Sequence, residues 1–279
     1  MPDNIIIAEN KYQQKIAFQA NDHIGEIILR DGIYDSRGLH YIEKILAQID
    51  KPVVFDIGAN IGNHALLMSR HSQVVYLFEP QANIANLLRQ TMSLNNITNW
   101  KICEFGLADE DRVLPLYKNL NGNNGASTFI SELKAKHFAV EELQVRHGDS
   151  IVNQYGINQL DFIKIDVEGF EAKVIAGLKN TIHRFRPIIM LEWNNDISKT
   201  QFREHDLFQQ VFHDYIIKAI IHSHHPSRWH AKTFAKIRRF FYKTFTEKKW
   251  VIDDFVAVYD YQHVLLVPTE KTSMLKGLE

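Results

Sequence analysis

The residues best suited to chemistry lie in one stretch, Lys51 to Arg70, which reads KPVVFDIGANIGNHALLMSR. A short apolar run rich in β-branched and aromatic residues is followed by Asp56, then by Gly58 and Gly62, and then by helix-forming residues. This order predicts a strand, a glycine-bearing turn and a helix. Because glycine has no Cβ, the backbone N–H groups at such a turn can approach a ligand closely.

A second acid, Glu79, ends another apolar run, Val74 to Phe78. It follows the glycines by about 20 residues, the distance at which an acid in a nucleotide-binding unit accepts hydrogen bonds from ribose hydroxyls. The glycine turn and this acid together predict a site for a nucleoside-type cofactor.

The spacing of the glycines restricts the type of cofactor. Asn60 stands where the dinucleotide pattern G-x-G-x-x-G would have its second glycine, so that pattern is absent. The G-K-[ST] sequence of a phosphate-binding loop is also absent after the turn. Asp56 lies two residues before Gly58. A carboxylate there would repel a pyrophosphate but attract an ammonium or a sulfonium, which favours a cofactor with a cationic tail.

Strands and helices are expected to alternate, which predicts an α/β fold with a parallel sheet covered on both faces. Strands are expected at 52–55, 74–78, 100–105, 162–165, 187–191 and 215–221 and within 255–267. Helices are expected from the glycine turn to 70 and at 83–95, 168–183 and 199–213. We expect a single domain, 1–279, made of a lead-in (1–49), a cofactor-binding core (50–222), a basic insertion (223–250) and a last strand with its tail (251–279). The lead-in either packs across the sheet edge or caps the cofactor, with Tyr34 at its lip.

The same residues carry a family resemblance. The run Asp56-Ile57-Gly58-Ala59-Asn60-Ile61-Gly62 resembles motif I of class I S-adenosylmethionine-dependent methyltransferases, and Phe78-Glu79-Pro80 resembles their ribose-binding acid. Leu160 to Trp193, which contains IKIDVEGFE, resembles the signature of the FkbM family of methyltransferases. The loop Asn124 to Thr128 is similar to the Gly/Ser loop of that family.

This resemblance implies a class I methyltransferase fold, a Rossmann-like doubly wound sheet of about seven strands whose last strand is antiparallel. It also implies S-adenosyl-L-methionine as the cofactor, bound at the carboxyl ends of the first four strands. Carried over by position, the cofactor-binding residues are Asp56, Gly58, Asn60, Gly62 and Asn63 on the methionine side, Glu79 and Pro80 at the ribose, and Gly106 and Leu107 at the adenine.

The strand at 162–165 carries the candidate catalytic residues. Alternate residues of a strand share a face, so Lys164 and Asp166 point the same way. A lysine inside an apolar strand is costly unless it is paired. One interpretation is a structural ion pair. The other is that Asp166 and Glu168 border the methyl-transfer site and Lys164 positions one of them. Asp166 is then the first candidate for base or orienter and Glu168 the second, whereas His64 is interpreted as a pocket wall.

We predict no metal in the site. One alternative is that Asp166 and the strand end Glu192-Trp193-Asn194-Asn195 form an oxygen-rich Mg²⁺ site. Another is a zinc site formed by the histidine cluster, which comprises His222, His224, His225 and His230.

The sequence restricts the identity of the methyl acceptor mainly by excluding classes of substrate. No Asn/Asp-Pro-Pro-aromatic motif follows the strand at 162–165, which argues against methylation of nucleobase amines, and the lone Cys103 lies away from the expected site. The FkbM resemblance implies O-methylation of a hydroxyl on a sugar, glycan or glycolipid. The alternatives are O-methylation of a free small-molecule metabolite and a non-catalytic module that binds the cofactor or anchors a glycan-synthesis complex.

Charge is unevenly distributed. The chain has a formal net charge of −1, but Arg228 to Lys249 carries eight Lys/Arg residues and one acid, a net +7, which leaves −8 for the remainder. Apolar residues at helical spacing predict a basic amphipathic helix before the last strand. It either packs on the sheet or contacts anionic lipid headgroups.

No apolar run of about 18 residues occurs, and the first residues do not resemble a secretory signal. We therefore expect a cytoplasmic protein, with peripheral contact to the inner face of the membrane if Arg228–Lys249 binds lipid. A nucleic-acid partner is not expected, and the oligomeric state stays open.

Overall fold

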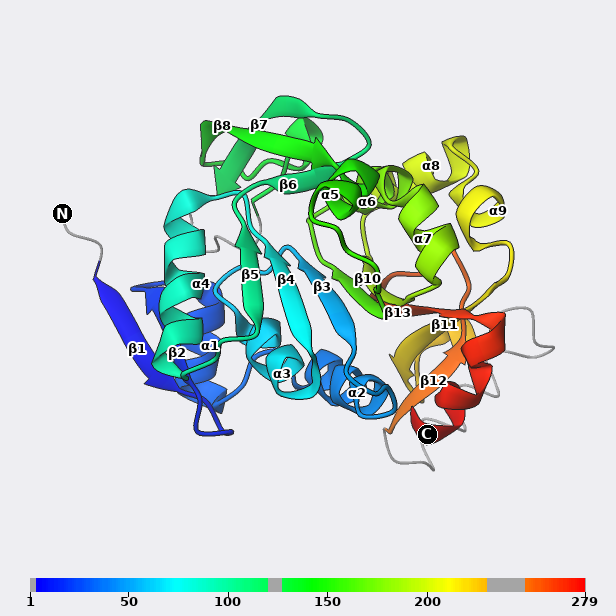
Figure 1. The fold of residues 1–279 in the computed structure, drawn as a ribbon, viewed down its shortest axis with the longest axis horizontal. Helices are drawn as coiled ribbons and strands as arrows, with labels where there is room; N and C mark the ends of the chain where they lie inside the picture. Colours follow the sequence, from blue (N-terminus) through cyan, green and yellow to red (C-terminus); the bar gives the residue numbers. More distant parts are fainter. Residues whose placement is uncertain (1–3, 120–126, 230–248, 279) are drawn as a thin grey trace.

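The computed structural model describes residues 4–119, 127–229 and 249–278 (Figure 1). In this part of the chain a mixed eight-stranded sheet has the order β12-β11-β13-β10-β9-β3-β4-β5. Its strands are β3 (Val53–Ile57), β4 (Val74–Phe78), β5 (Trp100–Cys103), β9 (Phe162–Ile165), β10 (Ile188–Trp193), β11 (Tyr215–His222), β12 (Trp250–Asp254) and β13 (Tyr261–Pro268). A hairpin, β1 (Ile5–Glu9) and β2 (Lys15–Gln19), and a small sheet of β6 (Gly106–Ala108), β7 (Arg112–Asn119) and β8 (Phe138–His147) complete the strands.

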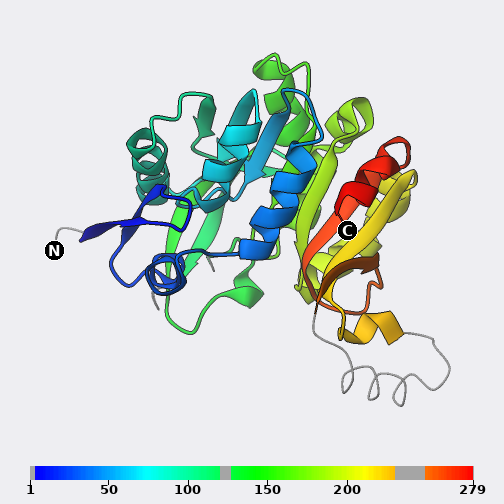
Figure 2. The same cartoon turned by 90° about the horizontal axis from the view of Figure 1, so that it is seen from below.

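Helices cover both faces of the large sheet, which confirms the doubly wound α/β fold (Figures 1 and 2). One face packs against α1 (His23–Asp31), α2 (Ser36–Leu46), α3 (Asn63–His71) and α4 (Ala82–Leu94). The other packs against α5 (Gly148–Gln154), α6 (Glu171–Gly177), α7 (Lys179–Phe185), α8 (Asp196–Glu204) and α9 (Leu207–Phe212). Alternate residues of a strand point to opposite faces of the sheet and therefore pack in different hydrophobic cores. Val54 packs on the face covered by α1–α4, and Phe55 packs on the face covered by α5–α9.

The last strand is antiparallel, as expected. β13 lies between β10 and β11 and runs antiparallel to both. The expected count of about seven strands is too low by one in the large sheet, because β12 pairs with β11 in antiparallel register from Lys218↔Asp254 to His222↔Trp250. The boundary of the basic insertion at residue 250 therefore falls inside a strand, and β12 covers an edge of β11 that would otherwise be open.

Two helices expected to be continuous are broken. The helix predicted at 168–183 begins only at Glu171, because Glu168 and Gly169 have positive φ angles of 50° and 97° in the turn after β9, and it divides into α6 and α7 around Leu178. The helix predicted at 199–213 divides into α8 and α9 at Asp206, whose φ is 47°. Apolar periodicity continues through both breaks, so spacing alone did not reveal them.

Two sequence predictions fall outside the described residues. They are most of the basic segment Arg228–Lys249 and most of the loop Asn124 to Thr128. At the base of the basic segment the backbone N–H of Ser223 donates to Lys249 O at 2.6 Å. Within the described ranges, no helix combines the length and the apolarity that a bilayer span requires.

The strand order reverses beside β3. From β3 the chain adds β4 and then β5 on one side, while β9 and then β10 lie on the other. Open α/β sheets bind ligands at such a switch point, outside the carboxyl ends of the strands. Here Gly58 follows β3 and Asp166 follows β9, and the two residues touch. Gly58 has a φ of +81°, and a Cβ on it would overlap the backbone oxygen of Asp166.

Gly58→Ala is expected to lower the free energy of unfolding by more than the roughly 1–2 kcal/mol cost of a left-handed residue, because the added Cβ also meets the β9 strand end. Urea denaturation measures this loss. The matched control is Gly156→Ala, since Gly156 also has a positive φ (+61°) but has nothing within 4 Å of an added Cβ. Equal losses in the two variants would contradict a close approach of the two strand ends.

Candidate functional site

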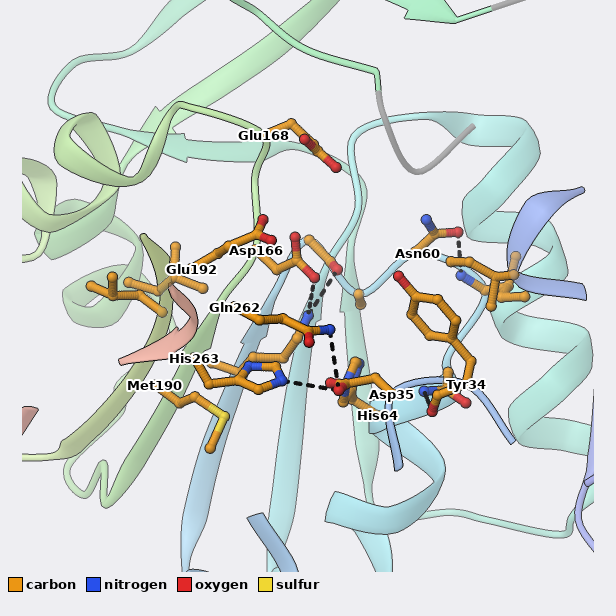
Figure 3. Close-up of a pocket in the computed structure, with 18 of the residues that line it drawn as sticks. Tyr34, Asp35, Asn60, His64, Asp166, Glu168, Met190, Glu192, Gln262 and His263 are labelled. Atoms are coloured by element: carbon orange, nitrogen blue, oxygen red, sulfur yellow. Dashed lines mark hydrogen bonds and ion pairs between the residues drawn. The ribbon is translucent and has the colours of Figure 1, made fainter. Parts of the chain in front are cut away.

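Two adjoining cavities open at the switch point and share Gly58, Asn60, Asp166 and Glu168. The first, here called the apolar cavity, lies toward β4 and the small sheet and includes Phe78, Glu79, Pro80, Gly106, Leu107 and Phe129. The second, called the polar cavity, lies toward β10 and β13 and includes Tyr34, Asp35, His64, Lys164, Glu192 and His263 (Figure 3). The glycine turn separates them.

Glu79 is the acid that belongs to the apolar cavity alone. It is 4% exposed, and its carboxylate accepts hydrogen bonds from the backbone N–H groups of Asn60 (3.2 Å) and Gln81 (3.0 Å). Burial raises the pKa of Glu79 to about 7. Gln81 Oε1 is also buried and has no hydrogen-bond partner among the described residues. Two buried acceptors beside apolar walls suit a ligand that joins hydroxyls or amines to a flat heterocycle.

Lys164 forms the floor of the polar cavity. Its Nζ lies 3.3 Å from Asp56 Oδ1 and 3.4 Å from Asp166 Oδ2, and it donates to Gly58 O at 3.5 Å. Burial alone would lower the pKa of Lys164, but the charges of Asp56 and Asp166 raise it above its ordinary value. The predicted pairing of this lysine is therefore present, and it joins β3 to β9.

Two of the predicted cofactor residues do not reach either cavity. The side chain of Asp56 is 0% exposed, pairs with Lys164 at 3.3 Å and lines neither cavity. Gly62, with a φ of +95°, faces α4, where an added Cβ would lie 2.7 Å from Leu88 Cδ1. Asn60 and Asn63 line the polar cavity, and Asn63 Nδ2 donates to Tyr34 O at 3.2 Å.

Three acids gather where the cavities meet. Asp166, Glu168 and Glu192 each offer an oxygen atom within 4.8 Å of the other two, a spacing that could hold a metal ion. Burial, with the charge of Asp166, raises the pKa of Glu168 to about 8 and also raises that of Glu192. Of the amides in the Mg²⁺ alternative, Asn194 donates from Nδ2 to Glu192 Oε1, and Asn195 uses its Oδ1 to cap α8.

The sequence interpretation assigned no chemistry to Asp35, Gln262 or His263, all of which line the polar cavity. Asp35 can be recognised in the sequence as a helix cap before α2. Nothing in the spacing links it to His263, which is 228 residues away. His64, interpreted as a pocket wall, does line this cavity, and it contacts Asp35.

A doubly wound sheet that carries a glycine turn and a buried acid at its switch point has the arrangement with which open α/β domains bind ligands. Residues 56–243 match the model of a family described as the methyltransferase FkbM domain. The chain belongs to this family.

Similar proteins include methyltransferase sdnD of Sordaria araneosa, which is 28% identical over 159 residues that cover 46% of this chain and 60% of sdnD. The 2-O-methyltransferase NoeI of Sinorhizobium fredii is 26% identical over 160 residues, 51% of this chain and 65% of NoeI. Hexuronic acid methyltransferase AglP of Haloferax volcanii is 26% identical over 167 residues, 57% of this chain and 64% of AglP. The chain thus spans less than two thirds of the length of each of these relatives.

Among solved structures, methyltransferase FkbM from Methylobacillus flagellatus is similar with a TM-score of 0.43 and 17% sequence identity. The match covers 66% of this chain and 42% of that one.

Lys164→Met is expected to lower the free energy of unfolding by about 3–5 kcal/mol, because it leaves Asp56 charged, buried and unpaired. Urea denaturation measures the loss, and the double variant Asp56→Asn/Lys164→Met should recover more than half of it. Lys173→Met is the matched control, because Lys173 pairs with Asp109 at 2.8 Å but both side chains are about a third exposed. Its free energy of unfolding should fall by no more than about 1 kcal/mol. Equal losses for Lys164→Met and Lys173→Met would argue against a buried ion pair.

Proposed function

We propose that this chain is an S-adenosyl-L-methionine-dependent O-methyltransferase that acts on a hydroxyl of a sugar, glycan or glycolipid. The observation that carries the proposal is the meeting of the two cavities at Gly58 and Asp166, in a chain of the FkbM methyltransferase family. One cavity suits a nucleoside, and the other presents polar groups to a second ligand.

The residues present fit the cofactor. In the apolar cavity, Glu79 accepts from the ribose hydroxyls, the unpartnered Gln81 Oε1 offers a further acceptor, and Leu107 and Phe129 provide apolar walls. Gly58 and Asn60 at the glycine turn would receive the methionine end, and Asp166 would present its carboxylate to the cationic centre. When bound, S-adenosylmethionine supplies an electrophilic methyl group.

The polar cavity then receives the acceptor. Asp166 is 40% exposed in its side chain and is held by Lys164, so its carboxylate can orient an acceptor hydroxyl in line with the methyl carbon. Glu168, across the same opening, is the second candidate for this role. Lys164 positions Asp166 and does not itself need to touch the acceptor.

Transfer to an oxygen is favoured by the name of one relative, a 2-O-methyltransferase, and a sugar acceptor by the name of another, a hexuronic acid methyltransferase. A cavity with several hydrogen-bonding side chains also suits a polyhydroxylated ligand. One alternative is a free small-molecule metabolite as the acceptor. The other is a non-catalytic module that binds the cofactor.

Glu79 predicts pH-dependent cofactor binding. Its carboxyl group is protonated below about pH 7, and a protonated carboxyl has fewer free acceptor positions for the ribose hydroxyls, so affinity should rise with pH. Calorimetry with S-adenosylmethionine should give binding roughly tenfold weaker at pH 6 than at pH 8. Glu79→Gln should bind weakly with little change between these values, and the same pH dependence in this variant would assign the effect to another group.

Asp166→Asn is expected to lower the kcat of methyl transfer by about 10²-fold or more, because the acceptor loses its orienting carboxylate. The assay follows transfer of a labelled methyl group to a panel of methyl hexopyranosides and methyl hexopyranosiduronates. Asp109→Asn, which disrupts an Asp–Lys pair outside both cavities, is the matched control.

Cofactor binding by Asp166→Asn should persist in calorimetry, which separates catalysis from folding. Unchanged turnover would remove Asp166 from the mechanism. Absence of S-adenosylmethionine binding by the wild type would overturn the proposed function. Transfer that survives EDTA would exclude a required metal at the three acids.

A further inference from the structure

Three side chains that the proposed mechanism does not use meet in the polar cavity (Figure 3). Asp35 lies in the turn before α2, His64 in the first turn of α3 and His263 near the start of β13. Each oxygen of the Asp35 carboxylate contacts one histidine. His64 Nε2 lies 2.9 Å from Oδ2, and His263 Nε2 lies 2.9 Å from Oδ1. One carboxylate thus holds two imidazole rings in the wall of the cavity.

The cluster is buried and its carboxylate is firmly held. The side chains of Asp35, His64 and His263 are 4%, 9% and 11% exposed. The backbone N–H of Gly38 also donates to Asp35 Oδ1 at 3.1 Å. A Cβ on Gly38 would overlap Asp35 Oδ2, so glycine leaves room for this carboxylate over the start of α2. Burial alone would raise the pKa of Asp35, but the hydrogen bonds from His263 and His64 lower it well below its usual range.

This arrangement determines which ring nitrogens carry protons. An ionised carboxylate only accepts hydrogen bonds, so the Nε2 of each histidine must be the donor. In the neutral imidazole the lone pair then lies on Nδ1. Among the residues that the structure describes, neither Nδ1 has a hydrogen-bond partner. A histidine with one nitrogen held by a carboxylate and the other free has the tautomer that a general base requires.

The topology brings the two histidines to the cavity from different elements. Because β13 is antiparallel to β10, its first residues lie at the edge of the sheet where β9 and β10 end. His263 is therefore placed beside Glu192 and Asp166, on the side proposed for the acceptor (Figure 3). His64, in the first turn of the helix that follows the glycine turn, lines the same cavity and contacts the other oxygen of Asp35.

We propose that His263 is the catalytic base that takes the proton of the acceptor hydroxyl, and that Asp35 is the positioning residue that fixes its tautomer. This inference rests on the proposed function. The acceptor oxygen forms its bond to the methyl carbon while the carbon–sulfur bond breaks and leaves its electron pair on sulfur. The hydroxyl proton passes to Nδ1 of His263, and the carboxylate of Asp35 stabilises the resulting imidazolium.

Asp166 keeps a separate task in this scheme. Its carboxylate lies 3.4 Å from the ammonium of Lys164, which holds it in place. It suits orientation of the hydroxyl, whereas a neutral imidazole suits removal of its proton.

The first test needs no acceptor. Nitrogen NMR spectra of the 279-residue chain with labelled histidine should show the neutral ring of His263 with its proton on Nε2 and a bare Nδ1. In Asp35→Asn, the amide accepts from one ring and donates to the other, so His64 or His263 should change tautomer. A proton on Nδ1 of wild-type His263, or no change at either ring in Asp35→Asn, would overturn the inference.

The second test uses the hexopyranoside or hexopyranosiduronate that the wild type methylates. His263→Gln and Asp35→Asn should each lower kcat by about 10²- to 10⁴-fold, the contribution of a general base, with S-adenosylmethionine binding retained in calorimetry. His64→Gln leaves the Asp35–His263 pair intact, so its kcat should fall less than that of His263→Gln. His40→Gln on the exposed side of α2 is the matched control.

Rescue separates a chemical role from a structural one. Free imidazole should restore part of the turnover of His263→Ala, and it should not help Asp166→Asn. Wild-type turnover in His263→Gln would overturn the assignment of the base and leave the proposed function standing. Failure of the wild type to bind S-adenosylmethionine would instead reject the proposed function, whatever the tautomer of His263.

Discussion

The site depends on one buried cation. Lys164 lies in the middle of an apolar sheet, where an unpaired ammonium would cost several kcal/mol, and it is balanced by Asp56 on β3 and Asp166 at the end of β9. This pairing favours the register Asp56↔Lys164 between the two strands. The register in turn places Gly58 against Asp166 at the point where the strand order reverses. A slip of one residue would turn Lys164 toward the opposite face of the sheet.

The two cavities follow from that contact. Gly58 and Asp166 divide the crevice at the strand ends into a part walled by β4 and the small sheet and a part walled by β10 and β13. A ligand that extends from the apolar to the polar side has to pass over the glycine turn, where the chain carries no Cβ. The lead-in contributes to the second part through Tyr34 and Asp35, so the N-terminal segment and the antiparallel strand β13 complete a wall that the central strands leave open.

Much of the core could be read from local patterns. The strands β4 and β9 match their predicted bounds, and Glu79, predicted to hold a ribose, lines a cavity together with Asn60. The interpretation of Asp56 did not anticipate that a lysine more than a hundred residues away would pair with it. The helix breaks at Leu178 and Asp206 were missed for a related reason, since close packing and a left-handed residue can interrupt a helix whose apolar spacing continues.

The sequence by itself determined the class of fold, the glycine turn, the acid after the second core strand and the family, because each of these shows in short runs whose residue types and spacing are local. Only the tertiary structure decided which groups face a ligand. Asp35, His64 and His263 are brought together from the lead-in, a helix start and the last strand, and Asp56 is turned away from the cavities it was expected to line. The periodicity of a strand tells which residues share a face, but strand pairing and helix packing determine what that face meets.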